Sequence, residues 1–119
     1  MNSTTDSSPW TLIASLRDFR GQRQLVRPVG ELQVLLLRVG TEIIAMHDSC
    51  PHLGKSLLGG RLMGGHITCP FHGACFDVRS GIALSGPAVA PLRRLPLQID
   101  GECILVDVTK GPVKSAGPP

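Results

Sequence analysis

Two short segments built on the same plan constrain this sequence more than any other feature: CPHLGK at residues 50–55 and CPFHGACFD at residues 69–77. Each begins with Cys-Pro, has a histidine two or three positions later, and continues with a glycine. Proline and glycine permit the tight turns that would point a thiolate and an imidazole toward one place. Two such segments facing each other would form a cage of four candidate ligands: Cys50, His52, Cys69 and His72. These ligand types leave two candidates open, tetrahedral zinc and an iron-sulfur cluster.

The rest of the chain consists of short apolar runs separated by turn residues. Runs such as LQVLLLRV at residues 32–39 are four to eight residues long and rich in Val, Ile and Leu, which is typical of β-strands. Glycine-containing links between the runs, such as Gly40-Thr41, predict hairpin turns. Only residues 56–58 could form a single helical turn. The sequence therefore predicts an all-β fold, a small antiparallel sandwich or barrel, with a Gly- and Pro-rich insertion at about residues 47–88.

Length and charge exclude several classes of protein. A chain of 119 residues is expected to form one domain, with polar tails at residues 1–8 and 109–119. Its net charge is only +3 and its twelve Lys and Arg are scattered, which argues against a nucleic-acid partner. No signal peptide and no apolar run long enough to span a membrane is present. We therefore expect a cytoplasmic protein, where cysteines bind metals or stay reduced.

The two Cys-Pro segments, followed by SGPAVAPL at residues 85–92, resemble those of Rieske 2Fe-2S proteins. The resemblance implies a Rieske domain over residues 9–108, with an antiparallel β-sandwich base and a small cluster-binding subdomain at about residues 47–88. It also implies one 2Fe-2S cluster, in which two histidines replace two cysteines on one of the irons. Cys50 and Cys69 would hold the buried iron, and His52 and His72 the outer iron.

Three positions indicate which Rieske proteins the chain resembles. High-potential respiratory members carry a disulfide between the two loops and a hydroxyl residue after the second His-Gly. This chain has Lys55, Phe71 and Ala74 at those positions. The pattern resembles the low-potential ferredoxins of bacterial ring-hydroxylating dioxygenase systems. The resemblance implies a monomeric one-electron carrier that takes electrons from a flavin reductase and passes them to a terminal oxygenase.

Two alternative functions belong to other classes. A catalytic oxygenase needs a mononuclear iron site with two further histidines and a carboxylate, and only His47 and His66 are spare. An enzyme active on its own is therefore not expected. The small Rieske-like subunit of a nitrite-reductase-like complex remains the alternative to the free carrier.

The remaining cysteines and histidines have no place in the ligand set. Cys75 and Cys103 lie in strand-like runs, and we expect both to be buried as small apolar residues. His47 and His66 each precede a ligand cysteine by three residues and are interpreted as ordinary polar positions on strands.

Overall fold

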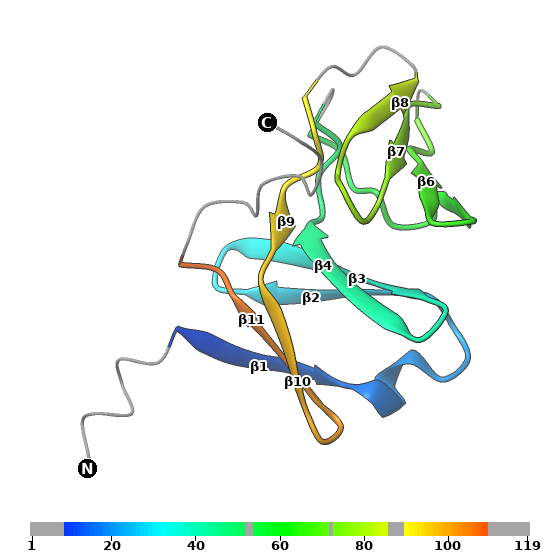
Figure 1. The fold of residues 1–119 in the computed structure, drawn as a ribbon. Helices are drawn as coiled ribbons and strands as arrows, with labels where there is room; N and C mark the ends of the chain where they lie inside the picture. The colour runs from blue at the N-terminus through cyan, green and yellow to red at the C-terminus, as the bar shows by residue number, and fades with distance from the viewer. Residues whose placement is uncertain (1–8, 52–53, 72, 86–89, 110–119) are drawn as a thin grey trace.

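The computed structural model describes residues 9–51, 54–71, 73–85 and 90–109. These residues form three antiparallel sheets, and the one helix among them is a four-residue 3-10 turn (Figure 1). None of the described residues belongs to a helix long and apolar enough to cross a membrane. The all-β fold expected from the sequence is confirmed. The predicted tails lie outside the described residues, apart from Thr109.

Two sheets form the base of the molecule. The lower sheet has the strand order β1-β11-β10 and the middle sheet the order β2-β3-β4-β9. The strands of the lower sheet are β1 (Trp10–Ser15), β10 (Leu97–Asp100) and β11 (Cys103–Asp107). Those of the middle sheet are β2 (Gln24–Val29), β3 (Leu32–Val39), β4 (Glu42–His47) and β9 (Arg94–Leu95). The 3-10 turn η2 (Leu16–Phe19) connects β1 toward β2, and Ser15 and Asp18 cap its first turn reciprocally.

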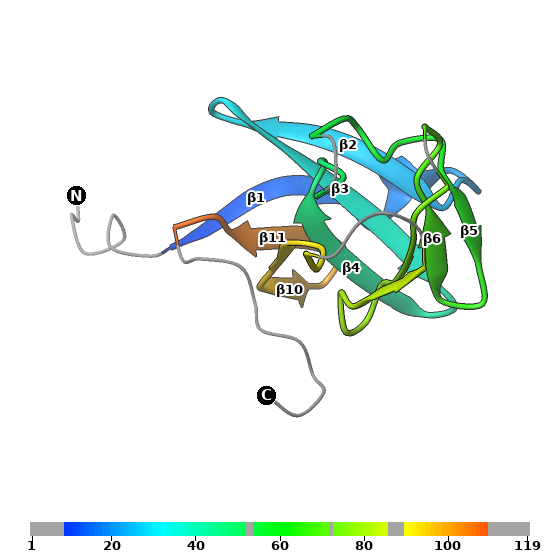
Figure 2. The same ribbon diagram turned by 90° about the horizontal axis from the view of Figure 1, so that it is seen from above.

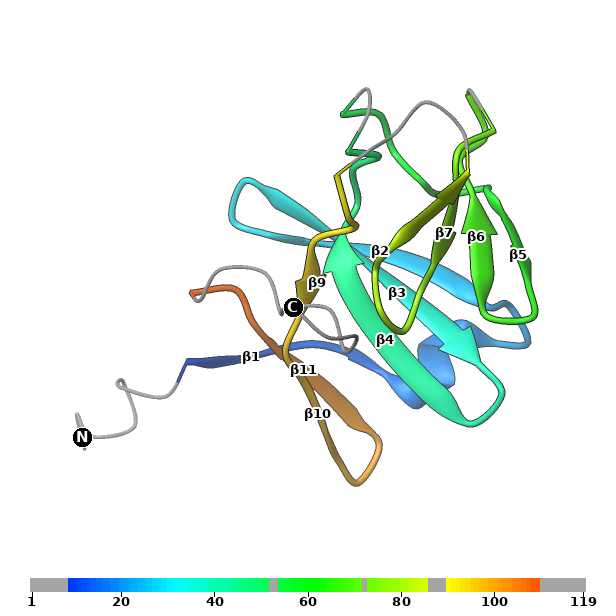
Figure 3. The same ribbon diagram turned by 45° about the horizontal axis from the view of Figure 1, so that its top comes forward.

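A third sheet, the upper sheet, is inserted between β4 and β9 in sequence. Its strand order is β5-β6-β7-β8, and Figure 3 shows these strands side by side above the middle sheet. The strands are β5 (Arg61–Met63), β6 (His66–Thr68), β7 (Cys75–Asp77) and β8 (Ala83–Ser85). Seen from above, the upper sheet lies over one end of the base, and the start of β1 lies at the other end (Figure 2).

The middle sheet is buried on both faces, which explains the continuous apolar run in β3. Val34 and Leu36 face the lower sheet, whereas Leu35 and Leu37 face the upper sheet, and all four are fully buried. The lower core, between the base sheets, consists of Ala14, Phe19, Leu25, Val34, Leu36, Ala45, Leu95, Ile104 and Val106. The upper core consists of Leu35, Leu37, Ile44, Met46, Cys50, Leu57, Leu62, Ile67, Cys69, Ala74, Phe76, Val78 and Leu92.

The structure corrects two local predictions. Residues 56–58 form no helical turn. Cys103 is exposed and Cys75 only half-buried, although both were expected to be buried. Successive side chains of a strand point to opposite faces, so Cys103 faces solvent because Ile104 and Val106 occupy the core face of β11. His47 ends β4 and His66 begins β6, as ordinary strand positions.

Candidate metal centre

The two Cys-Pro segments form backbone loops with the same hydrogen-bond pattern. In the first loop (residues 50–55), the Cys50 N–H donates to the Lys55 carbonyl at 2.7 Å and the Gly54 N–H donates to the Cys50 carbonyl at 2.6 Å. In the second loop (residues 69–74), the Cys69 N–H donates to the Ala74 carbonyl at 2.7 Å and the Gly73 N–H to the Cys69 carbonyl at 3.1 Å. In each loop, both the N–H and the carbonyl of the cysteine are therefore hydrogen-bonded to residues of the same loop.

Each loop also has its glycine in the left-handed region that this turn requires. Gly54 has a φ of 73° and Gly73 a φ of 75°, a conformation that residues with a side chain rarely adopt. The repeated Cys-Pro-x-x-Gly spacing in the sequence thus encodes one backbone turn twice. The sequence predicted these turns, and the structure confirms them.

The cysteines at the head of the loops lie in the same apolar environment. Cys50 and Cys69 are each 1% exposed and both belong to the upper core. None of the four cysteines forms a disulfide. Two buried thiols in matching loops fit a centre that takes one thiolate from each loop and is shielded from water by the upper core.

The other two predicted ligands, His52 and His72, lie outside the described residues. Among the described residues, no three His, Cys, Asp or Glu side chains lie close enough to hold a metal ion. The paired cysteines therefore need further donors to complete a metal centre. His52 and His72 belong to the same two loops, so the chemistry of this donor set suits a cluster with mixed thiolate and imidazole ligands.

Asp48 anchors the segment that carries the first loop, a role that the sequence analysis missed. Its carboxylate accepts a hydrogen bond from the Ser56 hydroxyl at 2.6 Å and another from the Leu57 N–H at 2.8 Å. Its own N–H donates to the carbonyl of Gln33 in β3 at 2.9 Å. These bonds hold Leu57 in the upper core, where it is fully buried beside the cysteines. The partners are eight and nine residues away, so no local motif indicated this role.

Lys55 and Phe71 connect the two loops on their outer side. The Lys55 Nζ lies 5.2 Å from the centroid of the Phe71 ring, within the range of a cation-π interaction. Lys55 is exposed and the Phe71 side chain is 56% exposed. These are the two positions at which high-potential Rieske proteins carry their disulfide, so a noncovalent contact joins the loops there instead.

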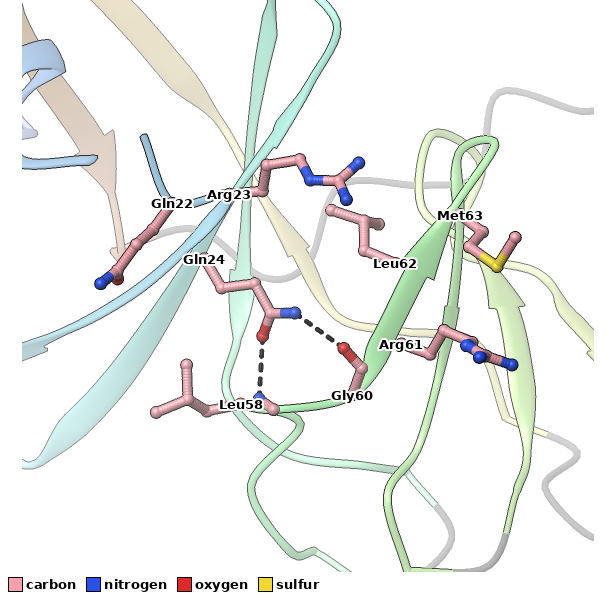
Figure 4. A pocket seen from close by; sticks show the side chains of 9 residues that line it. Gln22, Arg23, Gln24, Leu58, Gly60, Arg61, Leu62 and Met63 are labelled. Carbon is pink, nitrogen blue, oxygen red and sulfur yellow. Dashed lines mark hydrogen bonds between the residues drawn. The ribbon is translucent and has the colours of Figure 1, made fainter. Parts of the chain in front are cut away.

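Gln24 joins the upper part of the molecule to the base. Its side-chain amide donates to the Gly60 carbonyl at 2.7 Å and accepts from the Gly59 N–H at 2.9 Å (Figure 4). Gln24 lies at the start of β2, and Gly59 and Gly60 lie immediately before β5. One side chain thus fixes the path from the first loop into the upper sheet.

Two titratable groups near the loops have shifted pKa values. Partial burial, and to a smaller extent the positive charge of Arg93, lower the pKa of His47 below 6.5. Asp77, at the end of β7, accepts hydrogen bonds from the N–H groups of Ser80 and Arg79. The bond from Ser80 is the main reason that the pKa of Asp77 lies below its usual value. Burial thus disfavours the charged form of His47, and the hydrogen bonds favour the charged form of Asp77.

This combination of an all-β base, an inserted sheet and two matching Cys-Pro loops defines the class of protein. Residues 9–96 match the family of the Rieske [2Fe-2S] domain, and the chain belongs to that family. Its cofactor is one Rieske-type 2Fe-2S cluster.

Relatives within the family narrow the class to ferredoxins. The chain is 31% identical over 94 residues to the anthranilate 1,2-dioxygenase ferredoxin subunit of Burkholderia cepacia, covering 78% of this chain and 87% of that protein. It is 35% identical over 101 residues to the ferredoxin component of biphenyl 2,3-dioxygenase from Rhodococcus jostii (strain RHA1), covering 85% of this chain and 94% of that protein.

A solved structure of similar fold shows a ferredoxin with its redox partner. It is the complex of reduced oxygenase and oxidized ferredoxin in carbazole 1,9a-dioxygenase. The match has a TM-score of 0.74 and 30% sequence identity, and it covers 82% of this chain and 92% of that one. The chain is thus similar, in sequence and in fold, to electron-transfer components of dioxygenase systems.

Proposed function

We propose that this protein is a one-electron carrier that passes electrons from a flavin reductase to the terminal oxygenase of an aromatic-ring dioxygenase system. The observation that carries the proposal is the pair of matching loops, each with a buried cysteine, in a chain similar to the ferredoxin components of such systems. The cluster, when bound, supplies the one-electron chemistry. The protein acts as a carrier and catalyses no reaction on its own.

The proposed ligands are Cys50, His52, Cys69 and His72, one cysteine and one histidine from each loop. Two thiolates, two neutral imidazoles, two sulfides and two ferric ions sum to zero charge. An electron is added more easily to a neutral cluster than to one with a charge of minus two, as four thiolates would give. This difference accounts for Rieske potentials of roughly −150 to +300 mV, compared with about −400 mV for plant-type ferredoxins.

The surface of the upper part of the molecule suits brief contact with a partner. Seven large apolar side chains are more than 40% exposed among the described residues, and five of them lie between residues 58 and 84. The five are Leu58, Met63, Phe71, Ile82 and Leu84. In this proposal Phe71 forms an apolar contact patch with Leu53 and Pro87, and the last two lie outside the described residues. Transient redox encounters use small interfaces, below about 1,200 Å².

The cluster and its ligands are tested by spectroscopy. The purified protein should be brown and, when reduced, should give the low average g value that mixed nitrogen and sulfur ligation produces. His52→Cys and His72→Cys should lower the reduction potential if a cluster still assembles, because each adds a negative thiolate. A colourless protein with one zinc ion per chain would contradict the proposal.

The carrier role is tested with purified components. Reductase, this protein and oxygenase together should oxidise an aromatic substrate, and omission of this protein should abolish turnover. Co-purification with a large haem-bearing subunit would instead indicate the nitrite-reductase-like alternative.

The monomeric state and the cytoplasmic location stay predictions, to be checked by light scattering and cell fractionation.

A further inference from the structure

A continuous arginine-lined hollow runs along the junction of the base and the upper sheet. Three adjoining hollows share Arg23, and the largest, between the start of β2 and β5, measures about 550 Å³ (Figure 4). We call the combined surface the arginine groove and define it by Arg23, Arg38, Arg61 and Arg79. No Asp or Glu lines any of the three hollows. The groove therefore concentrates positive charge in a chain whose net charge is only +3.

Three of these four arginines lack a carboxylate partner within the described part of the chain, and the fourth, Arg79, is paired with Glu42. The ion pairs there are Arg17 with Glu102, Arg27 with Asp18, and Arg79 with Glu42. Arg23 and Arg61 take part in none of them. Arg38 also takes part in none of them: its guanidinium lies 6.0 Å from the centroid of the Phe19 ring, at the limit of a cation-π interaction, and has no carboxylate partner there. Three of the four positive charges of the groove are thus available to an external anion.

Apolar side chains flank the largest hollow. Leu58 is 49% exposed and Met63 is 61% exposed, on either side of Arg61 in sequence. Arginine and methionine are enriched at protein interfaces, where lysine and carboxylates are depleted. This mixture of exposed apolar and guanidinium groups suits a protein surface better than a small anion.

The groove is fixed in shape, and one end of it lies near the loops. The two hydrogen bonds of Gln24 hold the segment before β5 against β2, so the floor of the groove is already ordered before a partner arrives. Arg61 pairs with Thr68, which directly precedes Cys69 of the second loop, so this end of β5 is the end nearest the loops. A partner that contacts Arg61 can therefore also reach the loop end of the upper sheet.

We propose that the arginine groove is a docking surface for a carboxylate-rich face of the terminal oxygenase. This inference rests on the proposed function, because it needs a redox partner that meets the loop end of the molecule. The charge of the groove determines the chemistry of the partner surface, which presents Asp and Glu side chains. The groove steers and orients the encounter and leaves the reduction potential unchanged, since electrostatic complementarity acts mainly on association rates.

The test compares two double variants with the same net charge. Arg23→Gln/Arg61→Gln removes two charges from the groove, whereas the control Arg17→Gln/Arg27→Gln removes two from arginines that line none of the hollows. The Arg17–Glu102 pair is largely exposed, and the atoms of the partly exposed Arg27–Asp18 pair lie 3.6 Å apart, so neither ion pair contributes much to stability. Stopped-flow spectroscopy measures the second-order rate of electron transfer from each reduced protein to the terminal oxygenase purified from the same organism.

We expect the groove variant to transfer electrons about tenfold more slowly than the control at low ionic strength. The difference should disappear in about 0.3 M salt, where charges are screened over a few ångströms. Both variants should keep the wild-type visible spectrum and potential. Equal rates for the two variants would overturn the inference, as would a defect confined to reduction by the flavin reductase. A wild-type protein that holds a cluster but does not reduce the oxygenase would overturn the proposed function as well.

Discussion

Ala74 is the residue at which the electronic properties of the centre are most open to change. Its side chain is completely buried in the upper core, and its carbonyl accepts the hydrogen bond from the Cys69 N–H. High-potential members of the family have a hydroxyl residue at this position. The methyl group of Ala74 offers no donor to the centre, which fits a carrier of lower potential.

Ala74→Ser should therefore raise the reduction potential. A hydroxyl donating to a cluster sulfur stabilises the reduced, more negative state, and such a charge-assisted bond is worth about 1.5–3 kcal/mol. Only the difference between the oxidation states counts, so we expect a rise of some tens of millivolts, since a tenfold change in a one-electron equilibrium is about 59 mV. Voltammetry checks this, with the exposed Ala90→Ser as a control that should not shift.

Lys55 and Phe71 should protect the centre by keeping the two loops together. An exposed cation-π contact contributes about 0.5–1 kcal/mol. Lys55→Met and Phe71→Leu should each speed the loss of the cluster to a chelator. The double variant should lose it more slowly than the product of the single effects predicts, by about two- to fivefold. Fully multiplicative rates would show that the two side chains do not interact.

At the scale of elements, the sequence predicted the long strands and some of the short ones, such as β6 and β7, and missed others. Apolar runs of five to eight residues marked the five longest strands, from Trp10 to Asp107. Strands β5 and β8 are three residues long and each contains one polar residue, so they are too short to show a period. The 3-10 turn depends on the Ser15 and Asp18 side chains, and its single buried residue, Phe19, gives no helical pattern.

In the candidate site, features that depend on neighbouring residues could be predicted, and features that depend on distant residues could not. Both Cys-Pro turns are encoded by residues within each loop, so they could be predicted from the sequence. The anchoring of the first loop by Asp48 and of the following segment by Gln24 depends on partners far along the chain. No local pattern marks such contacts, because any surface Asp or Gln has the same appearance in a sequence.

His47, at the end of β4, should make stability depend on pH. Its pKa in the folded protein lies below the ordinary value of 6.5, so the unfolded chain binds a proton more readily. Stability is therefore complete above about pH 6.5 and falls as the pH decreases from there toward the lower folded-state value. His47→Gln should flatten this dependence.

The measurement is the thermal midpoint of the cluster-loaded protein between pH 5 and 7.5. His66→Gln, at an exposed position on β6, is the matched control. If the slope of the wild-type protein persists in His47→Gln, another group is responsible for it.

At the scale of the whole molecule, the lower core stabilises the base, and the upper core surrounds the two loop cysteines. The segment between Met46 and Leu95 includes both loops and the upper sheet, and the lower core contains none of its residues. The upper core, in contrast, contains both loop cysteines. The base can therefore stay folded when the upper part is disturbed. Residues of the middle sheet belong to both cores, so this sheet holds the loops in place relative to the base.

Removal of the cluster should consequently loosen the upper sheet and spare the lower one. We expect amide hydrogens of β5 to β8 to exchange much faster in the cluster-free protein, while those of β1, β10 and β11 keep their protection. Hydrogen exchange followed by mass spectrometry resolves the two groups of strands. An equal loss of protection throughout would show that the two cores unfold as one unit.

The pairing of β1 with β11 sets an order of events during synthesis of the chain. Trp10 is the partner of Asp107, so the lower sheet closes only when almost all of the fold has been translated. The upper core likewise extends to Leu92, well beyond Cys50 and Cys69. At about 5–20 residues per second, both thiols are made roughly one to eight seconds before Leu92, the last residue of the core that will bury them. During that interval they are open to oxidation and to zinc, so we expect the share of the protein that receives iron to depend on the redox state and the zinc level of the cell at the time of translation.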